Sequence, residues 1–401
     1  MLHERFQQAE NVMNTLMDHG FECYFVGGSV RDFLLNLPIR DVDIATNAKP
    51  EDMIRIFPRT VPVGIDHGTV LILDNNNAFE VTTYRIEDDY DDFRHPNRVE
   101  FVNDITLDLS RRDFTINAMA MDMKGRIIDP FDGQKDLKLK KIKTVGSAEN
   151  RFNEDPLRML RGLRFTSQLG FNLDEEIIES IQSNYVLLEH ISVERITEEL
   201  IRLFAGPFNR SSLPLMLDTN IYLALPIFKN DQLLIKKIIS TINRPIEEPA
   251  LLIALFHLID PSVSIREWAL QYKLSNTIKK GAIHLVHSYL KYNEHGLTNE
   301  VIYHLKKQWL IPFSQLVEMI DQKLFNQDKL LMKYDQLPIK NRNELVITGD
   351  DFLKWFPNKK RGKWVGDMLN KVEALVVENK LLNDYKAIEG VVKTWSIPDK
   401  K

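Results

Sequence analysis

Residues 27–46 read GGSVRDFLLNLPIRDVDIAT, and this stretch predicts how the first part of the chain folds. The apolar run FECYFV leads into Gly27 and Gly28, after which a helix is expected. A glycine turn between a strand and a helix exposes backbone N–H groups at the positive helix end, where phosphates bind. Asp41 and Asp43 follow, two residues apart, so in a strand both carboxylates project from one face. The stretch therefore predicts a phosphate-binding turn beside a pair of carboxylates.

The carboxylates of Asp41 and Asp43 repel each other unless a divalent cation lies between them. Such a pair suits phosphoryl transfer, because two bound metal ions can activate an attacking 3′-hydroxyl and stabilise the departing pyrophosphate. For an isolated Asp-x-Asp, an acidic turn beside an ordinary strand is the alternative. The glycine turn upstream favours the catalytic interpretation.

This region resembles the polymerase-β-like nucleotidyltransferase superfamily, whose signature is a Gly-Gly or Gly-Ser turn followed by a strand bearing Asp-x-Asp. A third metal carboxylate is common in that superfamily. Glu80, in the alternating run FEVTTYR, is the best-placed candidate for it. The alternative for Glu80 is an ordinary exposed strand position.

Composition limits the classes of protein to which the chain can belong. With 401 residues, 44% of them hydrophobic, the chain is long enough for several domains. It has no apolar run of 18 residues and a charged, amphipathic start, so neither membrane insertion nor export is indicated. Cys23 is the only cysteine, which excludes an intrachain disulfide and a cysteine-based zinc site and fits a reducing cytoplasm. The net charge of −5 argues against bulk attraction to nucleic acid, so any RNA contact requires local basic patches.

The pattern of apolar residues changes along the chain. Strand-like runs lie mostly in the first 145 residues, as FECYFVGG, GTVLILD, FEVTTYRI and MAMDMKGRIIDP. From about residue 146 the periodicity becomes helical, which predicts an α+β head followed by an all-helical remainder. The run LLIALFHLI is too short for a membrane span and indicates a buried helix. We predict a head over 1–145, a neck over 146–206, a body over 207–325 and a tail over 326–401.

A second motif, RRDFTINA, occupies residues 111–118. The adjacent guanidiniums of Arg111 and Arg112 are suited to bind triphosphate oxygens. Asp113 or Asn117 is suited to hold a sugar hydroxyl. The alternative for this motif alone is a solvated helix start.

A third motif, EDPLRMLRGLRF, occupies residues 154–165. Pro156 suits the first position of a helix, which makes Asp155 the expected N-cap. Three arginines then recur on one broad face while leucines between them supply the core, and they are Arg158, Arg161 and Arg164. The alternative is a capping aspartate with a solubilising stripe of arginines.

Taken together and in order, these motifs resemble the bacterial class of tRNA nucleotidyltransferases, the family of the CCA-adding enzymes and the bacterial poly(A) polymerases. The resemblance runs through GGSVRD, DVD, RRDFTINA, EDPLRMLR and the helix SVERITEE, and covers about residues 20–206. It implies the addition of C, C and A to the 3′ end of tRNA from CTP and ATP, with Mg²⁺ and without a nucleic-acid template. A homodimer is what relatives suggest.

The resemblance also implies roles for individual residues. Asp41 and Asp43 would bind the metal. The nucleotide-binding residues would be Gly28, Arg31, Arg112, Asp155, Arg158, Arg161 and Arg164. Asp155 and Arg158 would read the base, because a carboxylate plus a guanidinium satisfies the edges of cytosine and adenine but matches guanine and uracil poorly. The helix SVERITEE would brace this site with Arg195 and Glu198 as buried polar residues; a plain amphipathic helix is the alternative.

One segment departs from the family pattern. Residues 91–96 occupy the place of a flexible loop that usually contains Asp-Gly-Arg-Arg-Pro, whereas this chain has Asp92-Phe93-Arg94-His95-Pro96. In the family this loop assists the switch from CTP to ATP, and enzymes that add only CC lack it. Its presence favours full CCA addition, and its altered form leaves CC-only or A-only addition as alternatives.

Two further alternatives follow from the family and from its scaffold. Poly(A) polymerases of this lineage usually carry a basic C-terminal extension, whereas this chain is acidic and ends without one. A non-catalytic RNA-binding protein on the same scaffold is disfavoured by the intact Asp41 and Asp43.

The segment FPNKKRGKW, residues 356–364, is the candidate tRNA contact of the tail. Its cations are suited to bind phosphates and Trp364 to stack on a base. The cations are Lys359, Lys360, Arg361 and Lys363. The resemblance implies that the tail meets the T arm of tRNA; a solvated loop with a core tryptophan is the alternative.

Overall fold

The computed structural model describes residues 3–88 and 98–396. Contacts between residues divide the chain into two compact units. The first comprises Met1–Ile239 with Gln271–Lys273, and the second comprises Ser240–Leu270 with Leu274–Lys401. The finer division into head, neck, body and tail stays a prediction. The loop predicted at 91–96 lies outside the described residues.

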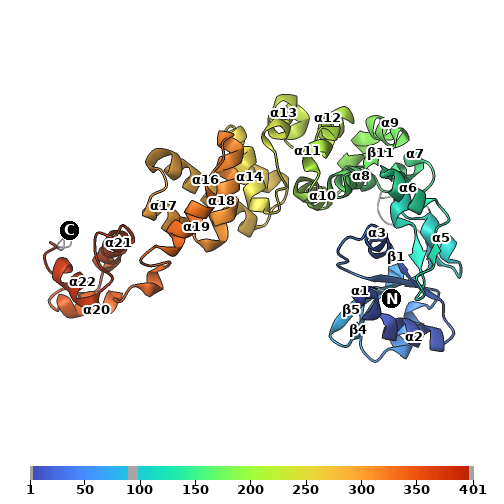
Figure 1. Cartoon of the computed structure of the whole chain (residues 1–401), viewed down its shortest axis with the longest axis horizontal. Coiled ribbons are helices and arrows are strands. Elements are labelled where there is room, and N and C mark those ends of the chain that lie inside the picture. Colours follow the sequence, from blue (N-terminus) through green and yellow to red (C-terminus); the bar gives the residue numbers. More distant parts are fainter. Residues whose placement is uncertain (1–2, 89–97, 397–401) are drawn as a thin grey trace. The chain divides into compact units, whose positions relative to one another are not determined.

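A mixed sheet forms the head, with strand order β3-β4-β5-β2-β1-β8-β9 (Figure 1). Strands β2 and β5 pair in parallel, and the other pairs are antiparallel. The strands of this sheet are β1 (Cys23–Val26), β2 (Asp43–Thr46), β3 (Thr60–Gly64), β4 (Thr69–Asp74), β5 (Asn77–Thr83), β8 (Ala120–Met121) and β9 (Ile127–Ile128). The four strand-like runs predicted from the sequence each supply strands, which confirms the α+β head.

Strand β3 was not predicted, and Pro62 explains why. Proline lacks a backbone N–H and lowers the expectation of a strand, but it is tolerated on an edge strand. Strand β3 is the edge of the sheet and its register with β4 is irregular between Pro62 and Gly64. The hairpin between β4 and β5 turns at Asn75 and Asn76, both with positive φ, as tight hairpin turns require.

Helices cover the head sheet, and a small hairpin forms a separate two-stranded sheet. A buried cluster that includes Val26, Ala45, Tyr84 and Leu109 lies where the sheet meets α5. The helices of the head are α1 (Glu4–Gln7), α2 (Glu10–Asp18), α3 (Gly28–Leu34), α4 (Pro50–Ile56), α5 (Ile105–Ser110) and α6 (Gly133–Leu139). The hairpin consists of β6 (Arg85–Asp88) and β7 (Arg98–Phe101).

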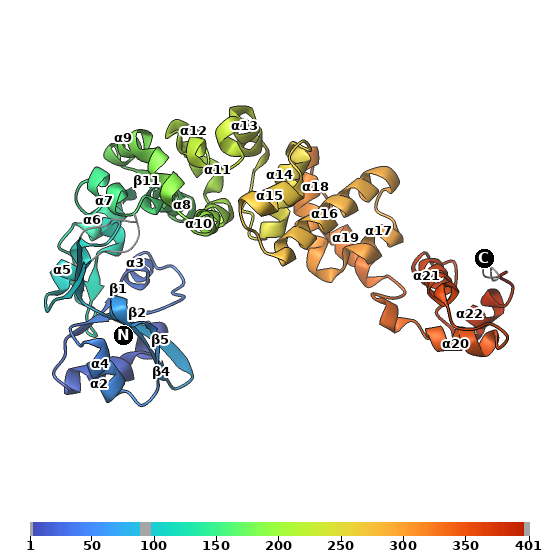
Figure 2. The same cartoon turned by 180° about the vertical axis from the view of Figure 1, so that it is seen from behind.

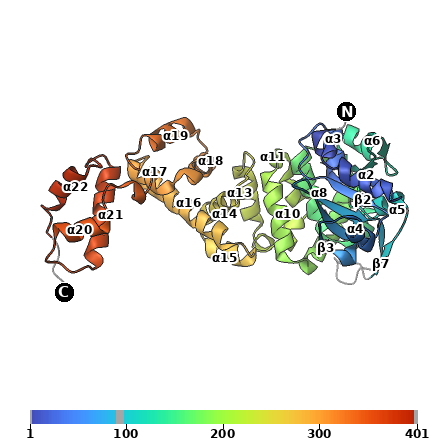
Figure 3. The ribbon, with the colours of Figure 1, turned by 90° about the horizontal axis from the view of Figure 1, so that it is seen from below.

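The rest of the first unit is mostly helical, and α8 packs along α10 (Figure 3). It is not all-helical as predicted, because the short strand β11 pairs with β10. Gly170, with φ 69°, ends α8, because that left-handed conformation suits glycine. Gly206 ends α10, and a Cβ there would lie 2.1 Å from Ser167 Oγ, so only glycine allows this close approach. The elements are α7 (Ala148–Glu154), α8 (Leu157–Leu169), α9 (Glu175–Asn184), α10 (Val193–Ala205), α11 (Asn209–Ser212), α12 (Leu215–Asp218) and α13 (Gln232–Thr241), with β10 (Lys141–Ile142) and β11 (Asn172–Leu173).

The second unit is built from helices, with α14, α16 and α18 packed against one another (Figure 2). The run LLIALFHLI lies in α14, and its residues 250–256 are buried in this core as predicted. No helix in the described part of the chain is long and apolar enough to cross a membrane. The helices are α14 (Pro249–Ile259), α15 (Ile265–Gln271), α16 (Asn276–His295), α17 (Asn299–Leu305), α18 (Leu310–Asp321), α19 (Gln327–Asp335), α20 (Gly349–Trp355), α21 (Lys363–Val377) and α22 (Tyr385–Val392).

Candidate active site

A pocket of about 620 Å³ in the first unit collects most of the predicted site residues. Its size lies within the range of small-molecule sites, roughly 300–1,000 Å³. The predicted residues that line it are Gly28, Arg31, Asp43, Arg112, Asp155, Arg158, Arg161 and Arg164. Asp41 and Glu80 are not among the lining residues. The three motifs read from the sequence thus converge on one pocket.

The glycine turn lies directly beside one of the predicted metal ligands. Gly27 precedes α3 with φ 70°, a left-handed conformation that suits glycine. A Cβ on Gly27 would lie 3.0 Å from Arg112 Nη1 and 3.8 Å from Asp43 Oδ2. A side chain at this position would therefore crowd the Arg112 guanidinium and touch the Asp43 carboxylate.

The charge around Asp43 fits a divalent cation. Burial raises the pKa of the Asp43 carboxyl, and Glu80 and Asp41 raise it further while Arg112 opposes them. Glu80 is the register partner of Asp43 across the parallel pair of β2 and β5. A cation bound here would relieve the repulsion between these carboxylates. In the described ranges no group of three or more His, Cys, Asp or Glu is arranged to hold a metal ion, so Glu80 as third ligand stays a prediction.

Asp108, which was not predicted from the sequence, holds the two adjacent arginines of the second motif. Its side chain is 1% exposed and lies 2.9 Å from Arg111 Nη2 and 3.3 Å from Arg112 Nη2. A signal for it was present, because residues three and four apart on a helix are neighbours. The arginines are thus oriented from behind by a buried carboxylate.

Asp113 and Asn117 link α3 to α8. Asp113 Oδ2 accepts from Arg161 Nε at 2.8 Å and from Arg161 Nη2 at 2.6 Å. Although burial opposes ionisation, the Arg161 guanidinium holds the pKa of Asp113 well below its usual range. Asn117 donates to Asp113 Oδ1 at 3.2 Å and accepts from Arg31 Nη1 at 2.7 Å. Both residues line the pocket, and their contacts fix the positions of Arg31 and Arg161.

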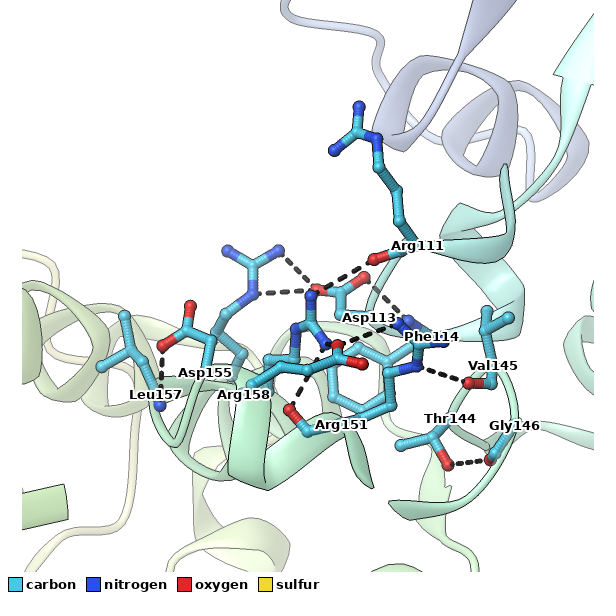
Figure 4. Close-up of polar contacts among 12 residues, drawn as sticks. Arg111, Asp113, Phe114, Thr144, Val145, Gly146, Arg151, Asp155, Leu157 and Arg158 are labelled. Carbon is cyan, nitrogen blue, oxygen red and sulfur yellow. Dashed lines mark hydrogen bonds and ion pairs between the residues drawn. The ribbon is translucent and has the colours of Figure 1, made fainter. Parts of the chain in front are cut away.

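Asp155 caps α8, and Arg158 is held beside it (Figure 4). Asp155 Oδ1 accepts from the backbone N–H of Leu157 at 3.1 Å, which confirms the predicted cap, although the helix begins at Leu157. Asp155 Oδ2 accepts from Arg195 Nη2 at 2.8 Å. Arg158 donates from Nη1 to Glu154 at 2.5 Å and from Nη2 to the Arg111 carbonyl at 3.2 Å. The predicted base-reading pair is therefore positioned by other parts of the same unit.

The buried carboxylate of α10 is Glu199, and the prediction of Glu198 was wrong. Glu198 is exposed, whereas the side chain of Glu199 is 6% exposed, 3.1 Å from Arg164 Nε and 3.8 Å from Arg161 Nη1. Burial lowers the pKa of Arg164 to about 10 and the Glu199 carboxylate opposes this. Arg195 is partly buried and binds Asp155, as expected of a bracing residue.

Glu199→Ala should destabilise the first unit far more than Glu198→Ala. Removing Glu199 leaves the Arg164 guanidinium buried without its carboxylate, and breaking such a pair costs about 3–5 kcal/mol. Thermal unfolding should therefore shift downwards by on the order of 10 °C. Glu198→Ala is the matched control, because it removes the same charge one residue away on the exposed face. Equal melting temperatures for the two variants would contradict this assignment.

Phe165 is a second pocket residue that was not predicted from the sequence. Its ring is 4% exposed and lies 4.4 Å from the guanidinium carbon of Arg164 and 5.2 Å from that of Arg31. Cations near an aromatic face are attracted by its quadrupole. Phe165 therefore helps to hold arginines from α3 and α8 together. Gln168 and Arg202, also unforeseen, complete the wall of the pocket at the far end of α8.

Family models match the chain along most of its length. They describe the Poly A polymerase head domain over residues 23–143, the probable RNA and SrmB-binding site of polymerase A over residues 170–231, and the putative domain 2 of tRNA nucleotidyltransferase over residues 246–392. These matches fall on both compact units.

Individual relatives match over nearly the whole chain. The CCA-adding enzyme of Oceanobacillus iheyensis is 42% identical over 395 residues, which is 98% of each protein. That of Bacillus cereus is 38% identical over 96% of this chain and 97% of its own. The crystal structure of the Bacillus stearothermophilus CCA-adding enzyme in complex with CTP is 35% identical, with a TM-score of 0.85 over 98% of this chain and 97% of that one. The Thermotoga maritima CCA-adding enzyme, solved with tRNA, shares the fold at 20% identity and a TM-score of 0.62.

The site and the matches agree with one another. The pocket is lined by the glycine turn, the Asp43 carboxylate and arginines from all three motifs. The most similar relatives reported above align with nearly the whole chain. The chain belongs to the family of CCA-adding enzymes, within the tRNA nucleotidyltransferases and poly(A) polymerases.

Proposed function

We propose that this protein adds C, C and A to the 3′ end of tRNA from CTP and ATP, with release of pyrophosphate. The observation that carries the proposal is that Asp155 and Arg158, the predicted base-reading residues, line the same pocket as Gly28 and Asp43. A nucleotide with its base at α8 can then place its phosphates at the start of α3, where backbone N–H groups and arginines lie.

Asp155 and Arg158 keep hydrogen-bonding capacity for a base. A carboxylate has about four acceptor sites; Arg195 and the Leu157 N–H use one on each oxygen of Asp155. A guanidinium has five N–H groups; Glu154 and the carbonyls of Arg151 and Arg111 take three of those on Arg158. The remaining acceptors and donors suit the N4 donor and the N3 and O2 acceptors of cytosine, and the N6 donor and N1 acceptor of adenine. The protein would thereby select both bases itself.

Asp41 and Asp43 would hold Mg²⁺, with Glu80 as a third ligand. When bound, the metal ion supplies Lewis-acid activation of the RNA 3′-hydroxyl and neutralises charge on the leaving pyrophosphate. The residues of this chain bind and orient the substrate. Arg31 and Arg112 neutralise triphosphate oxygens, and Arg161 and Arg164 keep the neighbouring wall of the pocket positive. In-line attack of the 3′-oxygen on the α-phosphorus forms one phosphodiester bond and breaks the bond to pyrophosphate.

Incubation with a tRNA transcript that lacks its last three nucleotides tests this proposal. Mg²⁺ is supplied with each nucleoside triphosphate singly and then with CTP plus ATP, and the products are sequenced. Growth by C, C and A followed by arrest is the expected result. Arrest after two C residues would mark a CC-adding enzyme and long A tails a poly(A) polymerase, and either would overturn the proposal. No extension would favour a non-catalytic RNA-binding protein.

The tail offers a surface for the tRNA elbow. Lys360, Arg361 and Lys363 are exposed, and Arg361 lies 3.3 Å from Asp350. Lys359 is half-buried. Trp364 donates from its indole N–H to the Lys360 carbonyl at 2.9 Å and packs edge-on against Phe356, which fixes the turn that presents the lysines. We propose that this turn binds tRNA phosphates.

Lys360→Ala combined with Lys363→Ala should weaken tRNA binding about tenfold. It should also reduce the slope of log K against log salt concentration by about one to two, because each phosphate contact contributes about 0.9 to that slope. The kcat for addition to a saturating tRNA should not change. The matched control replaces Lys323 and Lys386, which are exposed elsewhere in the second unit. Equal tRNA affinity for both double variants would remove the tail turn from the binding surface.

We further propose a homodimer, which the family resemblance suggests, and a cytoplasmic location. A homodimer would sediment with the mass of two chains, and a single-chain mass at all concentrations would exclude it. A cytoplasmic location fits the single buried cysteine, Cys23, and a fluorescent fusion that follows the envelope instead would contradict it.

A further inference from the structure

Besides the predicted metal ligand Asp43, two polar side chains of the pocket make no hydrogen bond or ion pair with the described residues: Gln168 and Arg202. Every other arginine of the pocket lies within 3.3 Å of a carboxylate oxygen. These pairs are Arg31–Asp32, Arg111–Asp108, Arg112–Asp108, Arg158–Glu154, Arg161–Asp113, Arg164–Glu199 and Arg195–Asp155. Arg202 therefore contributes an uncompensated positive charge to the wall of the pocket.

Gln168 and Arg202 lie at the end of the pocket away from the base-reading pair. Gln168 follows Arg158 by ten residues on α8, which corresponds to about 15 Å along a helix. Stacked bases are only about 3.4 Å apart along a strand. The stretch of α8 from Arg158 to Gln168 is therefore longer than the separation of two stacked bases, so a nucleotide next to the incoming one would lie along it.

The two side chains are held on locked helices. Ser167, beside Gln168, donates from Oγ to the carbonyl of Leu203, beside Arg202, at 2.6 Å. Both Ser167 and Leu203 are fully buried. The relative placement of Gln168 and Arg202 is therefore fixed by the packing of α8 on α10, as a binding site requires.

The surroundings of Arg202 favour an anion. Arg202 is exposed, and its charge is among the influences that lower the pKa of the neighbouring Arg164, which shows that the two cations repel. An anion bound at Arg202 would offset this repulsion. The RNA phosphate nearest the reacting 3′-hydroxyl is an anion that must approach this pocket if the chain extends RNA.

We propose that Gln168 and Arg202 form a second subsite, which holds the 3′-terminal nucleotide of the RNA beside the incoming nucleotide. Arg202 binds the phosphate that joins the last two nucleotides, and Gln168 contacts the terminal nucleoside. This inference rests on the proposed function, because only a nucleotidyltransferase needs an RNA end in the same pocket as a triphosphate.

A double-mutant cycle tests the phosphate contact by equilibrium binding without nucleotides, so turnover is not required. The ligands are a tRNA ending in two cytidines and the same RNA with an uncharged methylphosphonate at its last linkage. The wild-type chain should bind the methylphosphonate RNA about tenfold more weakly than the ordinary RNA. Arg202→Ala should bind the ordinary RNA about tenfold more weakly and should not distinguish the two. Arg202→Lys should recover part of the difference.

Arg210→Ala is the matched control, because Arg210 is exposed in the same unit and does not line the pocket. It should behave as the wild type. Gln168→Ala should weaken RNA binding severalfold but keep its sensitivity to the methylphosphonate. CTP affinity, measured without RNA, should be unchanged in all these variants.

Three outcomes would overturn the inference. The first is that the methylphosphonate weakens binding equally in the wild type and in Arg202→Ala. The second is that Arg202→Ala loses as much affinity for CTP as for RNA. The third is that Gln168→Ala binds RNA as tightly as the wild type. The proposed function fails separately: a chain that shows the expected cycle but never extends RNA would keep the subsite and lose the enzymatic assignment.

Discussion

Asp43→Asn should lower the rate of CTP and ATP incorporation by at least about a thousandfold, while RNA binding stays close to that of the wild type. A metal ion contributes several kcal/mol of transition-state stabilisation, and each 1.36 kcal/mol corresponds to a factor of ten in rate. Asparagine keeps the shape of the side chain but is a much weaker ligand for Mg²⁺. Single-turnover extension of a tRNA that lacks its CCA end measures the effect. Incorporation within tenfold of the wild type would contradict a catalytic role for Asp43.

Asp43→Asn should not destabilise the metal-free fold. Because burial and nearby carboxylates raise the pKa of Asp43 in the folded state, its ionised form opposes folding once the pH rises through that pKa. The variant should therefore be at least as stable as the wild type at pH 7, and the difference should disappear at acidic pH. Mg²⁺ should raise the melting temperature of the wild type but not of the variant. Asp18→Asn, an exposed change elsewhere in the head, is the control and should keep the response to Mg²⁺.

Asp155→Asn should change which base is incorporated. The asparagine oxygen can still cap α8 through the Leu157 N–H, so the helix should begin as before. The new amide nitrogen donates where the carboxylate accepted, which opposes the N4 donor of cytosine and suits the O4 acceptor of uracil. One such pair is worth about 1–3 kcal/mol, so the preference for CTP over UTP should fall by about 10- to 100-fold. Competition between CTP and UTP in one extension reaction measures this ratio.

The Asp155→Asn variant distinguishes a role in base selection from a general loss of folding stability. Loss of the pair between Asp155 and Arg195 will lower the melting temperature to some extent, so stability is measured alongside selectivity. Asp155→Ala should also lose activity with CTP, but without the gain with UTP, because alanine offers no donor. Equal CTP-to-UTP ratios in the wild type and both variants would remove Asp155 from base selection.

The parts of the site that are local in sequence could be predicted from it. Gly28 and Asp43 belong to one strand–turn–helix–strand unit, and Asp155 caps the helix that carries Arg158 and Arg161, so spacing alone places them. That the three motifs share one pocket was predicted from the family resemblance, since the contact between Arg31 and Asn117 joins residues far apart in the chain.

The site residues that were not predicted from the sequence escaped prediction for separate physical reasons. Glu199 continues the buried series of Ile196, Leu200 and Leu203, so the helical period favoured it over Glu198, and the prediction chose the wrong residue. Asp108 was readable from its spacing to the two arginines, but only with the helix boundary known.

Phe165 was not readable from the sequence at all. Its role depends on the approach of α3 to α8, which brings Arg31 over the ring of a residue that helical periodicity assigns to the core. Local pattern therefore predicts which side chains a helix presents, whereas the partners they meet depend on tertiary packing.

Displacement of labelled CTP from the wild-type chain tests whether one pocket accepts both CTP and ATP and rejects UTP and GTP. With Mg²⁺ and no RNA, ATP should displace CTP completely and competitively, with one nucleotide bound per chain. UTP and GTP should displace it only at concentrations about 10- to 100-fold higher, from the cost of one mismatched polar pair. Simultaneous binding of CTP and ATP would show that they occupy separate sites. Displacement by UTP and GTP at concentrations similar to that of ATP would show that the pocket does not select the base.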